Sequence, residues 1–151
     1  MSAKTVRIGS ASGFWGDTAS AAPALVKGGD IGYLVFDYLA EVTMSILAAQ
    51  KGKDPNAGYA TDFVHITMKA LLPELKAKGI KVVANAGGVN PIACRDALAK
   101  VAEELGVPLK IGVVLGDDLS ARAGEFRERG LTEMFSGAAF PQRTASINAY
   151  L

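Results

Sequence analysis

The stretch KVVANAGGVNPIACRDALAKVAEELG, residues 81–106, decides the fold class that we predict for this chain. Its first residues are apolar and rich in valine, as in a strand that is covered on both faces. A glycine-rich turn leads into a helix that Asn90 can cap, Pro91 can start and Gly106 can end. A strand, a glycine turn and a helix in this order are typical of an α/β unit.

The same pattern recurs along the chain. Near-continuous apolar runs at residues 5–9, 33–37, 81–85 and 110–115 predict four buried parallel strands. Helical patterns at 18–29, 39–52 and 61–79 separate them, and Leu39, Val42, Met44, Ile46 and Leu47 suggest a broad apolar face on the second. We therefore expect one Rossmann-like α/β domain over residues 1–151, a parallel sheet flanked by helices.

Two helix boundaries carry specific expectations. Asp17 or Thr18 can cap the helix at 18–29, and Pro73 predicts a break or kink near Leu72.

Residues 117–135 are charged and predict a short helix with loops. Residues 144–151 look like a helix still in progress, which suggests that the chain is the N-terminal part of a larger α/β protein. The alternative is a last helix that docks on the sheet, as chain ends often do.

Composition restricts the function classes. A net charge of +1 gives little support to sequence-independent nucleic-acid binding, and the apolar runs are too short to span a bilayer. The N-terminus lacks the apolar region of a signal peptide, and the single cysteine, Cys94, cannot form an internal disulfide. These features favour a cytoplasmic protein, with a small-molecule ligand and neither nucleic acid nor membrane as partner.

Polar residues and glycines follow every predicted strand, and in an open α/β sheet ligands bind outside the carboxyl ends of the strands. Turns also need such residues, but the first and third loops are richer in them than a turn requires. We therefore expect a ligand site at this edge of the sheet. Its candidate residues are Ser10, Ser12, Gly13, Trp15, Gly16, Asp17, Asp37, Glu41, Asn85, Gly87, Gly88, Asn90 and Asp117.

The first and third loops both open onto helices, so their backbone N–H groups can hold a carboxylate or a phosphate, as in a CoA thioester. Neither loop is a dinucleotide or P-loop motif. Trp15, the only tryptophan, would lie over a ligand's apolar part, or would simply pin its loop to the first helix. Serine hydrolysis is disfavoured, because the only histidine, His65, does not follow the Ser…Asp…His order of such hydrolases along the chain. We expect His65 to be a partly buried residue of a helix.

The acids at this edge suggest acid/base chemistry or Mg²⁺ binding, if they converge. Asp117 and Asp118 are adjacent, so we expect one to face the site and the other to cap the next turn. Asp17 could instead be a plain helix cap. No Cys/His set has zinc spacing, and Cys94 reads as a small core residue.

Five blocks of the chain resemble, in order, the acyclic terpene utilisation AtuA family: RIGSASGFWGD, GGDIGYLVFDYLAEVTMSIL, GYATDFV, VVANAGGVNP and KIGVVLGDDL. The resemblance covers essentially the whole chain. Members of the family are longer and continue into further α/β structure. They are associated with bacterial breakdown of acyclic terpenes such as citronellol and geraniol, often beside acyl-CoA carboxylase and enoyl-CoA hydratase-type genes. The resemblance carries over all the candidate residues given above, Ser10 and Ser12 included.

The resemblance implies three hypotheses. The first is an enzyme acting on a branched carboxylic acid or its CoA thioester by hydration or lyase chemistry, with Asp37, Glu41 and Asp117 as catalytic residues and glycine loops that stabilise an oxyanion. The second is a module that binds acyl-CoA or docks a carboxylase partner without catalysis. The third is a subunit that self-associates, or contacts further sequence, through an apolar patch near Ile147, Tyr150 and Leu151.

Overall fold

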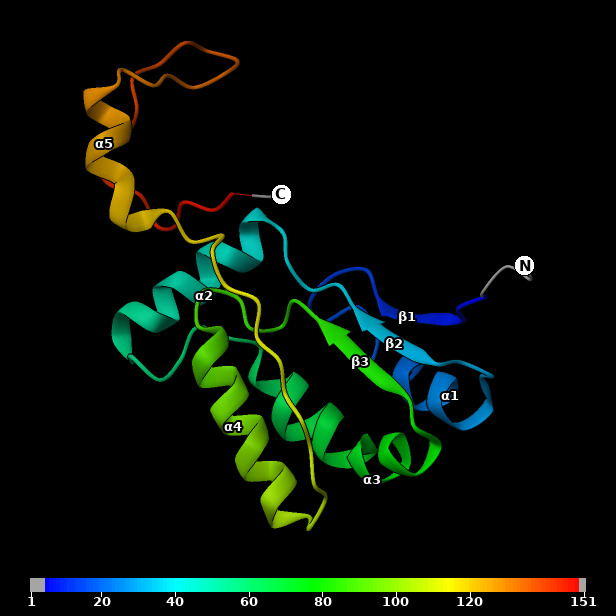
Figure 1. Ribbon diagram of the computed structural model, residues 1–151. Helices are drawn as coiled ribbons and strands as arrows, with labels where there is room; N and C mark the ends of the chain where they lie inside the picture. Colours follow the sequence, from blue (N-terminus) through cyan, green and yellow to red (C-terminus); the bar gives the residue numbers. More distant parts are fainter. Residues whose placement is uncertain (1–4, 150–151) are drawn as a thin grey trace. The chain divides into compact units, whose positions relative to one another are not determined.

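The computed structural model describes residues 5–149, which form two compact units divided after Val113. The first unit contains a sheet and its helices, and the second contains one short helix and a hairpin (Figure 1). The elements of the first unit are β1 (Ile8–Ser12), α1 (Ala21–Gly28), β2 (Tyr33–Phe36), α2 (Glu41–Lys53), η1 (Phe63–Met68), α3 (Lys69–Lys78), β3 (Lys81–Ala84) and α4 (Pro91–Glu104). Those of the second are η2 (Ser120–Arg122) and α5 (Ala123–Glu128).

The sheet has three parallel strands in the order β1-β2-β3. Ile8 pairs with Tyr33, and Tyr33 pairs with Lys81, so the three strands end together at their carboxyl edge. Helices connect the strands, because parallel neighbours need a crossover. The α/β class with a parallel sheet and flanking helices is therefore confirmed.

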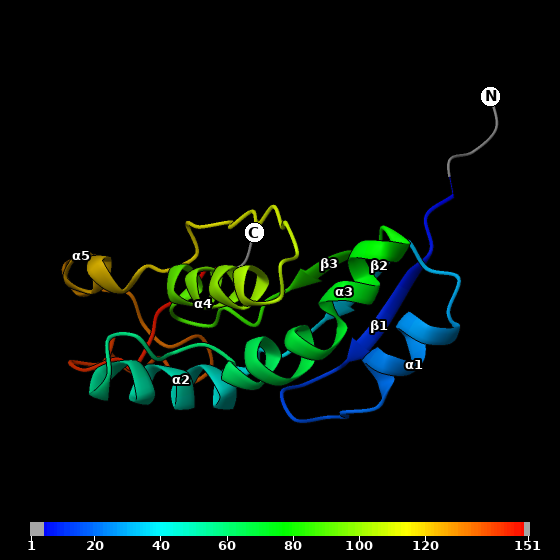
Figure 2. The ribbon, with the colours of Figure 1, turned by 90° about the horizontal axis from the view of Figure 1, so that it is seen from below.

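Helices α1 and α3 lie on one face of this sheet (Figure 2). Ala11, Leu34 and Phe36 are buried on that face, and α1 and α3 lie in front of it in Figure 2. On the opposite face, the side chains of Ile8 and Val83 are 63% and 55% exposed. The expectation of strands covered on both faces is thus wrong for the described residues, since apolar runs do not reveal which face finds a cover.

The core beneath the covered face is built from aliphatic and aromatic side chains. Leu34, Leu47, Leu72 and Leu75 are among the largest fully buried side chains. The rings of Phe36, Tyr38 and Phe63 pack edge to face, with centroids 5.2–6.1 Å apart. This aromatic group joins the end of β2 to the start of η1, so the core continues up to the carboxyl edge of the sheet.

The first strand begins three residues later than residues 5–9 suggested. β2 starts at Tyr33, whose partner is Ile8, so residues 5–7 have no strand beside them. Ser10 and Ser12 consequently lie within β1 and not in the loop after it. Ser10 is exposed, whereas Ser12 is buried beyond an irregularity in the register between these two residues.

The fourth predicted strand, residues 110–115, does not form. Leu109 and Ile111 pack against the core, while Lys110 and Gly112, which alternate with them, are exposed. Val114 is 93% exposed and begins the second unit. The segment therefore has one apolar face where the sequence predicted two, and β3 remains an edge strand among the described residues.

The helices are confirmed, with local differences. α1 starts after Ser20, because the Thr18 hydroxyl accepts the Ser20 amide and Asp17 bonds elsewhere. In α2, Val42 and Ile46 are exposed although they were expected on its apolar face. Pro73 lies inside α3 without ending it, and the irregularity of this helical stretch is the π-helix η1, which precedes α3.

The second unit holds the short helix expected after Gly116. Asp118 accepts a hydrogen bond from the Ser120 amide, which confirms that one of the paired acids caps the next turn. Residues 144–149 contain no helix, and Asn148 instead forms an isolated bridge with Asp118. Ile147 is half-buried, while Tyr150 and Leu151 lie outside the described residues.

The glycine turn after β3 provides a test of this packing. Gly88 has a φ of +52°, and a Cβ there would collide with Leu47 and lie 2.8 Å from the Gly58 carbonyl oxygen. Gly106 has a φ of +64° but open space around it. We expect Gly106→Ala to cost about 1 kcal/mol and Gly88→Ala about 2–5 kcal/mol, because overpacking adds to backbone strain. Urea unfolding measures both, and equal losses would contradict the packing described.

Candidate functional site

The side chain of Asn85, just past the end of β3, joins two strand ends. Its Oδ1 accepts the backbone N–H of Tyr38 at 2.7 Å, and its Nδ2 donates to Asp37 Oδ1 at 2.7 Å. Both partners directly follow β2. One neutral amide therefore fixes the chain after β2 and orients the Asp37 carboxylate, which is exposed.

The end of β1 joins the same group. The Asp37 amide donates to the Ser12 carbonyl at 3.4 Å, and the Ser12 hydroxyl donates to the Asp37 carbonyl at 3.4 Å. The backbone N–H of Asn85 in turn donates to the Phe36 carbonyl at 3.4 Å. Ser12, Asp37 and Asn85 come from three different strands, and the structure brings them together as the sequence predicted for residues that follow parallel strands.

The loop after β1 is closed by its own acid. Asp17 Oδ2 accepts the Gly13 amide at 2.9 Å, and the Asp17 amide donates to the Phe14 carbonyl. Gly16 adopts a φ of +88° with open space around it. Within the described residues, the amides of Phe14, Trp15 and Gly16 make no hydrogen bond. The loop thus keeps donors available, although its acid does not cap α1 as expected.

Trp15 ties this loop to a distant part of the chain. Its indole Nε1 donates to Asp62 Oδ1 at 2.8 Å, and its ring packs half-buried against the core. Asp62 immediately precedes the π-helix η1, a type of segment that is frequent at functional sites. Trp15 therefore pins its loop, but to the start of η1 and not to the first helix.

Tyr38 and Asp62 belong to the site although neither was among the candidates. Burial, and then the neighbouring Asp62 carboxylate, raise the pKa of Tyr38 to about 12, while a hydrogen bond with Thr67 acts the other way. Asp62 stands at the start of a helical pattern, where an acid is ordinarily a simple helix-terminus residue. The one signal in the sequence that could have indicated Asp62 is Trp15, because a partly buried indole N–H needs a hydrogen-bond acceptor.

Three further candidates have packing roles in the structure. A Cβ on Gly87 would lie 2.7 Å from Pro91, and Gly88 is confined by Leu47. Asn90 Nδ2 donates to the carbonyls of Pro55 and Ala57, at 2.8 Å each, and so holds the loop before η1. Three backbone amides of this turn already have acceptors: those of Gly88, Val89 and Asn90 donate to the carbonyls of Asn85, Gly58 and Gly87. The turn therefore offers an anion fewer free N–H donors than its glycines suggested.

The remaining acids, Glu41 and Asp117, belong to different units. Glu41 is the exposed first residue of α2, and its side chain has no partner among the described residues. Asp117 belongs to the second unit, where it accepts a hydrogen bond from Asn148 Nδ2 at 2.9 Å. The described residues include no group of three or more acids, histidines or cysteines that could hold a metal. A role for Asp117 beside Asp37 stays a prediction.

Two other side chains with reactive groups, Cys94 and His65, make no hydrogen bond to Ser12, Asp37 or Asn85 among the described residues. Cys94 is buried in α4, and burial raises the pKa of its thiol to about 11, which confirms it as a core residue. His65 is exposed on η1, so the expectation of a partly buried histidine is wrong. Among the described residues, no helix is both long and apolar enough to cross a membrane.

Tyr38 gives a pH-dependent test of the site's burial. Its folded-state pKa of about 12 exceeds the ordinary value of 10, so the unfolded chain loses this proton first as pH rises. Folding stability should therefore fall between about pH 10 and pH 12 through this residue, and Tyr38→Phe should flatten that fall. Urea unfolding across this range, with Tyr33→Phe as control, measures the effect. An equal slope for Tyr38→Phe and the unmodified protein would contradict it.

Comparison with known families identifies the chain. The family model described as acyclic terpene utilisation family protein AtuA matches residues 6–151. Comparisons with curated proteins and with solved structures found no match. The matched range contains Ser12, Asp37 and Asn85 and extends over both compact units. The chain therefore belongs to the acyclic terpene utilisation family AtuA.

Proposed function

We propose that this protein is an enzyme of acyclic terpene breakdown that acts on a branched carboxylic acid or its CoA thioester by hydratase or lyase chemistry. Membership of the family supports the pathway, and the association of such proteins with the breakdown of acyclic terpenes such as citronellol and geraniol supports the substrate class. The observation that carries the chemistry is the Asp37 carboxylate. It is exposed at the carboxyl edge of the sheet and held by the Asn85 amide.

Asp37 would act as the general base and acid of a hydration. The carboxylate takes a proton from water while the water oxygen bonds to the β-carbon of an unsaturated thioester. The π electrons move onto the thioester oxygen, and the proton then returns to the α-carbon, so the step is balanced. The reverse sequence is the lyase reaction. Asn85 would keep the carboxylate in one orientation through both proton transfers.

The loop after β1 would serve the rest of the substrate. The amides of Phe14, Trp15 and Gly16 are available to hold the enolate oxygen that develops during addition. Phe14 is 56% exposed and Trp15 half-buried, so the same loop offers aromatic surface to a branched hydrocarbon chain. Glu41 is a second exposed acid that could share the proton transfers, and Mg²⁺ is assigned no role.

Quenching of the single tryptophan, Trp15, tests binding. We expect saturable quenching by the CoA thioester of an unsaturated branched acid and little effect from unrelated thioesters. Asp37→Asn should keep this quenching while hydration, followed by loss of the conjugated thioester's absorbance, falls about 10²–10⁴-fold. Asn85→Ala should lower hydration by about tenfold or more through the freed carboxylate. Asp96→Asn, an exposed carboxylate on α4, is the matched control.

The alternative is a module that binds acyl-CoA or a carboxylase partner without catalysis. It predicts quenching with no hydration under any condition, and no difference between Asp37→Asn and Asp96→Asn. Turnover that is unchanged in Asp37→Asn would refute the assigned role of this residue. Absence of quenching by every thioester and free acid would remove Trp15 from the binding site.

A further inference from the structure

The hairpin of residues 131–140 is built to hold its tip in one shape. The Phe140 amide donates to the Leu131 carbonyl, and the Glu133 amide donates to the Ala138 carbonyl. The Glu133 carboxylate accepts the amides of Phe135 and Ser136. A side-chain hydrogen bond with Ser136, and then these backbone amides, hold the pKa of Glu133 below its ordinary value. The tip is therefore ordered by hydrogen bonds and not by burial of its side chains.

The two residues at this tip present large apolar side chains to solvent. Met134 is 82% exposed and Phe135 is 88% exposed. Aromatic and Met side chains are enriched at protein interfaces, and a pre-organised loop loses little entropy on binding. An ordered tip that carries Met and Phe is therefore suited to insertion into an apolar hollow.

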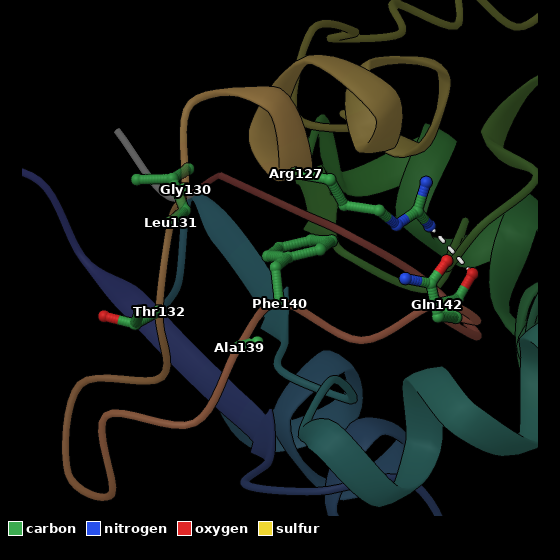
Figure 3. A pocket seen from close by; sticks show the side chains of 7 residues that line it. All are labelled: Arg127, Gly130, Leu131, Thr132, Ala139, Phe140 and Gln142. Carbon is green, nitrogen blue, oxygen red and sulfur yellow. Dashed lines mark hydrogen bonds between the residues drawn. The ribbon is translucent and has the colours of Figure 1, made fainter.

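Such a hollow lies at the base of the same hairpin. Its volume is about 190 Å³, and it is lined by the side chains and backbone drawn in Figure 3: Arg127, Gly130, Leu131, Thr132, Ala139, Phe140 and Gln142. An apolar cavity of about 150 Å³ is already large enough for benzene. One phenyl ring can therefore occupy this hollow.

The charges of the tip and the hollow are opposite. Arg127 donates to the carbonyls of Pro141 and Gln142, and its guanidinium lies 5.9 Å from the centre of the Phe140 ring (Figure 3). Among the described residues, neither Arg127 nor Glu133 forms a salt bridge. A cation thus stands at the hollow and an anion at the tip. The hydrogen-bond partners of both are neutral: backbone groups and, for Glu133, also the Ser136 side chain.

We propose that two copies of this chain associate through these hairpins, side by side and antiparallel. The Phe135 ring of each copy enters the hollow of the other, and Glu133 faces the other copy's Arg127. The contact is isologous, so it closes a two-fold dimer and not a chain of molecules. Because each side contributes one short hairpin, the interface is small, and we expect a Kd on the order of 100 µM.

Sedimentation equilibrium of the whole chain at concentrations up to about 1 mM tests this dimer. The unmodified protein should show a monomer–dimer equilibrium, and Phe135→Ser should weaken it at least tenfold. Ile66→Ser, which removes another large apolar side chain that is exposed (67%) on η1, should leave it unchanged. A chain that is monomeric at about 1 mM overturns the proposal, as does equal weakening by both variants.

A mixing experiment tests the reciprocal arrangement. Ala139→Phe fills the hollow but keeps the tip, whereas Phe135→Ser keeps the hollow but lacks the tip. Each variant alone should associate poorly, and an equimolar mixture should form a heterodimer through one remaining contact. Far-UV circular dichroism checks that Ala139→Phe is folded. If it is not, Phe135→Ser with the unmodified chain provides the mixture, which should form heterodimers more weakly than the unmodified chain forms homodimers. For the mixture of the two variants, association no better than that of each variant alone overturns the exchange; for the mixture with the unmodified chain, a heterodimer as strong as the homodimer overturns it.

Discussion

The side-chain amide of Asn85 is the interaction on which the candidate site depends. It bonds the backbone after β2 and the carboxylate of Asp37 at the same time, with both atoms of the amide in use. Each strand of a parallel sheet turns away at its end into its own helix, and among the described residues only two long backbone bonds, Asp37 to Ser12 and Asn85 to Phe36, join the residues that follow. The Asn85 side chain supplies a further connection across 47 and 48 positions of sequence.

The rest of the edge is arranged around this connection. Ser12 ties β1 to Asp37, and Trp15 ties the next loop to Asp62. Tyr38 lies between these two ties, with its backbone bonded to Asn85 and its ring in the aromatic group of the core. The exposed carboxylate therefore stands on a buried and hydrogen-bonded base, which is the combination that an acid/base residue requires.

The sequence predicted the architecture where periodicity and glycine turns agree. Residues 81–106 form a strand, a turn and a helix as expected, with Pro91 at the first helical position. The failures have physical causes. A run of apolar residues such as 110–115 does not reveal whether a neighbouring strand is free to pair with it. Likewise, β1 can start only at Ile8, because its partner strand begins at Tyr33. Exposed Val42 and Ile46 show that apolar residues on a helix do not by themselves identify its buried face.

The site could be predicted in outline but not in detail. The rule that ligands bind beyond parallel strand ends located Ser12, Asp37 and Asn85, which the structure joins. It could not reveal that Gly88 and Asn90 hold neighbouring backbone, nor that Asp62 accepts the indole of Trp15, since both depend on contacts far apart in sequence. The rule also grouped Asp117 with these residues, whereas the hydrogen-bond partner of its carboxylate is Asn148, in the second unit.

Hydrogen exchange of the Tyr38 amide tests the central role of Asn85 most directly. This amide lies beyond the end of β2, and its hydrogen-bond acceptor is Asn85 Oδ1. We expect it to exchange slowly in the unmodified protein, and at least tenfold faster in Asn85→Ala, while the amides within β2 change little. A Tyr38 amide that exchanges at the same rate in both proteins would contradict the account.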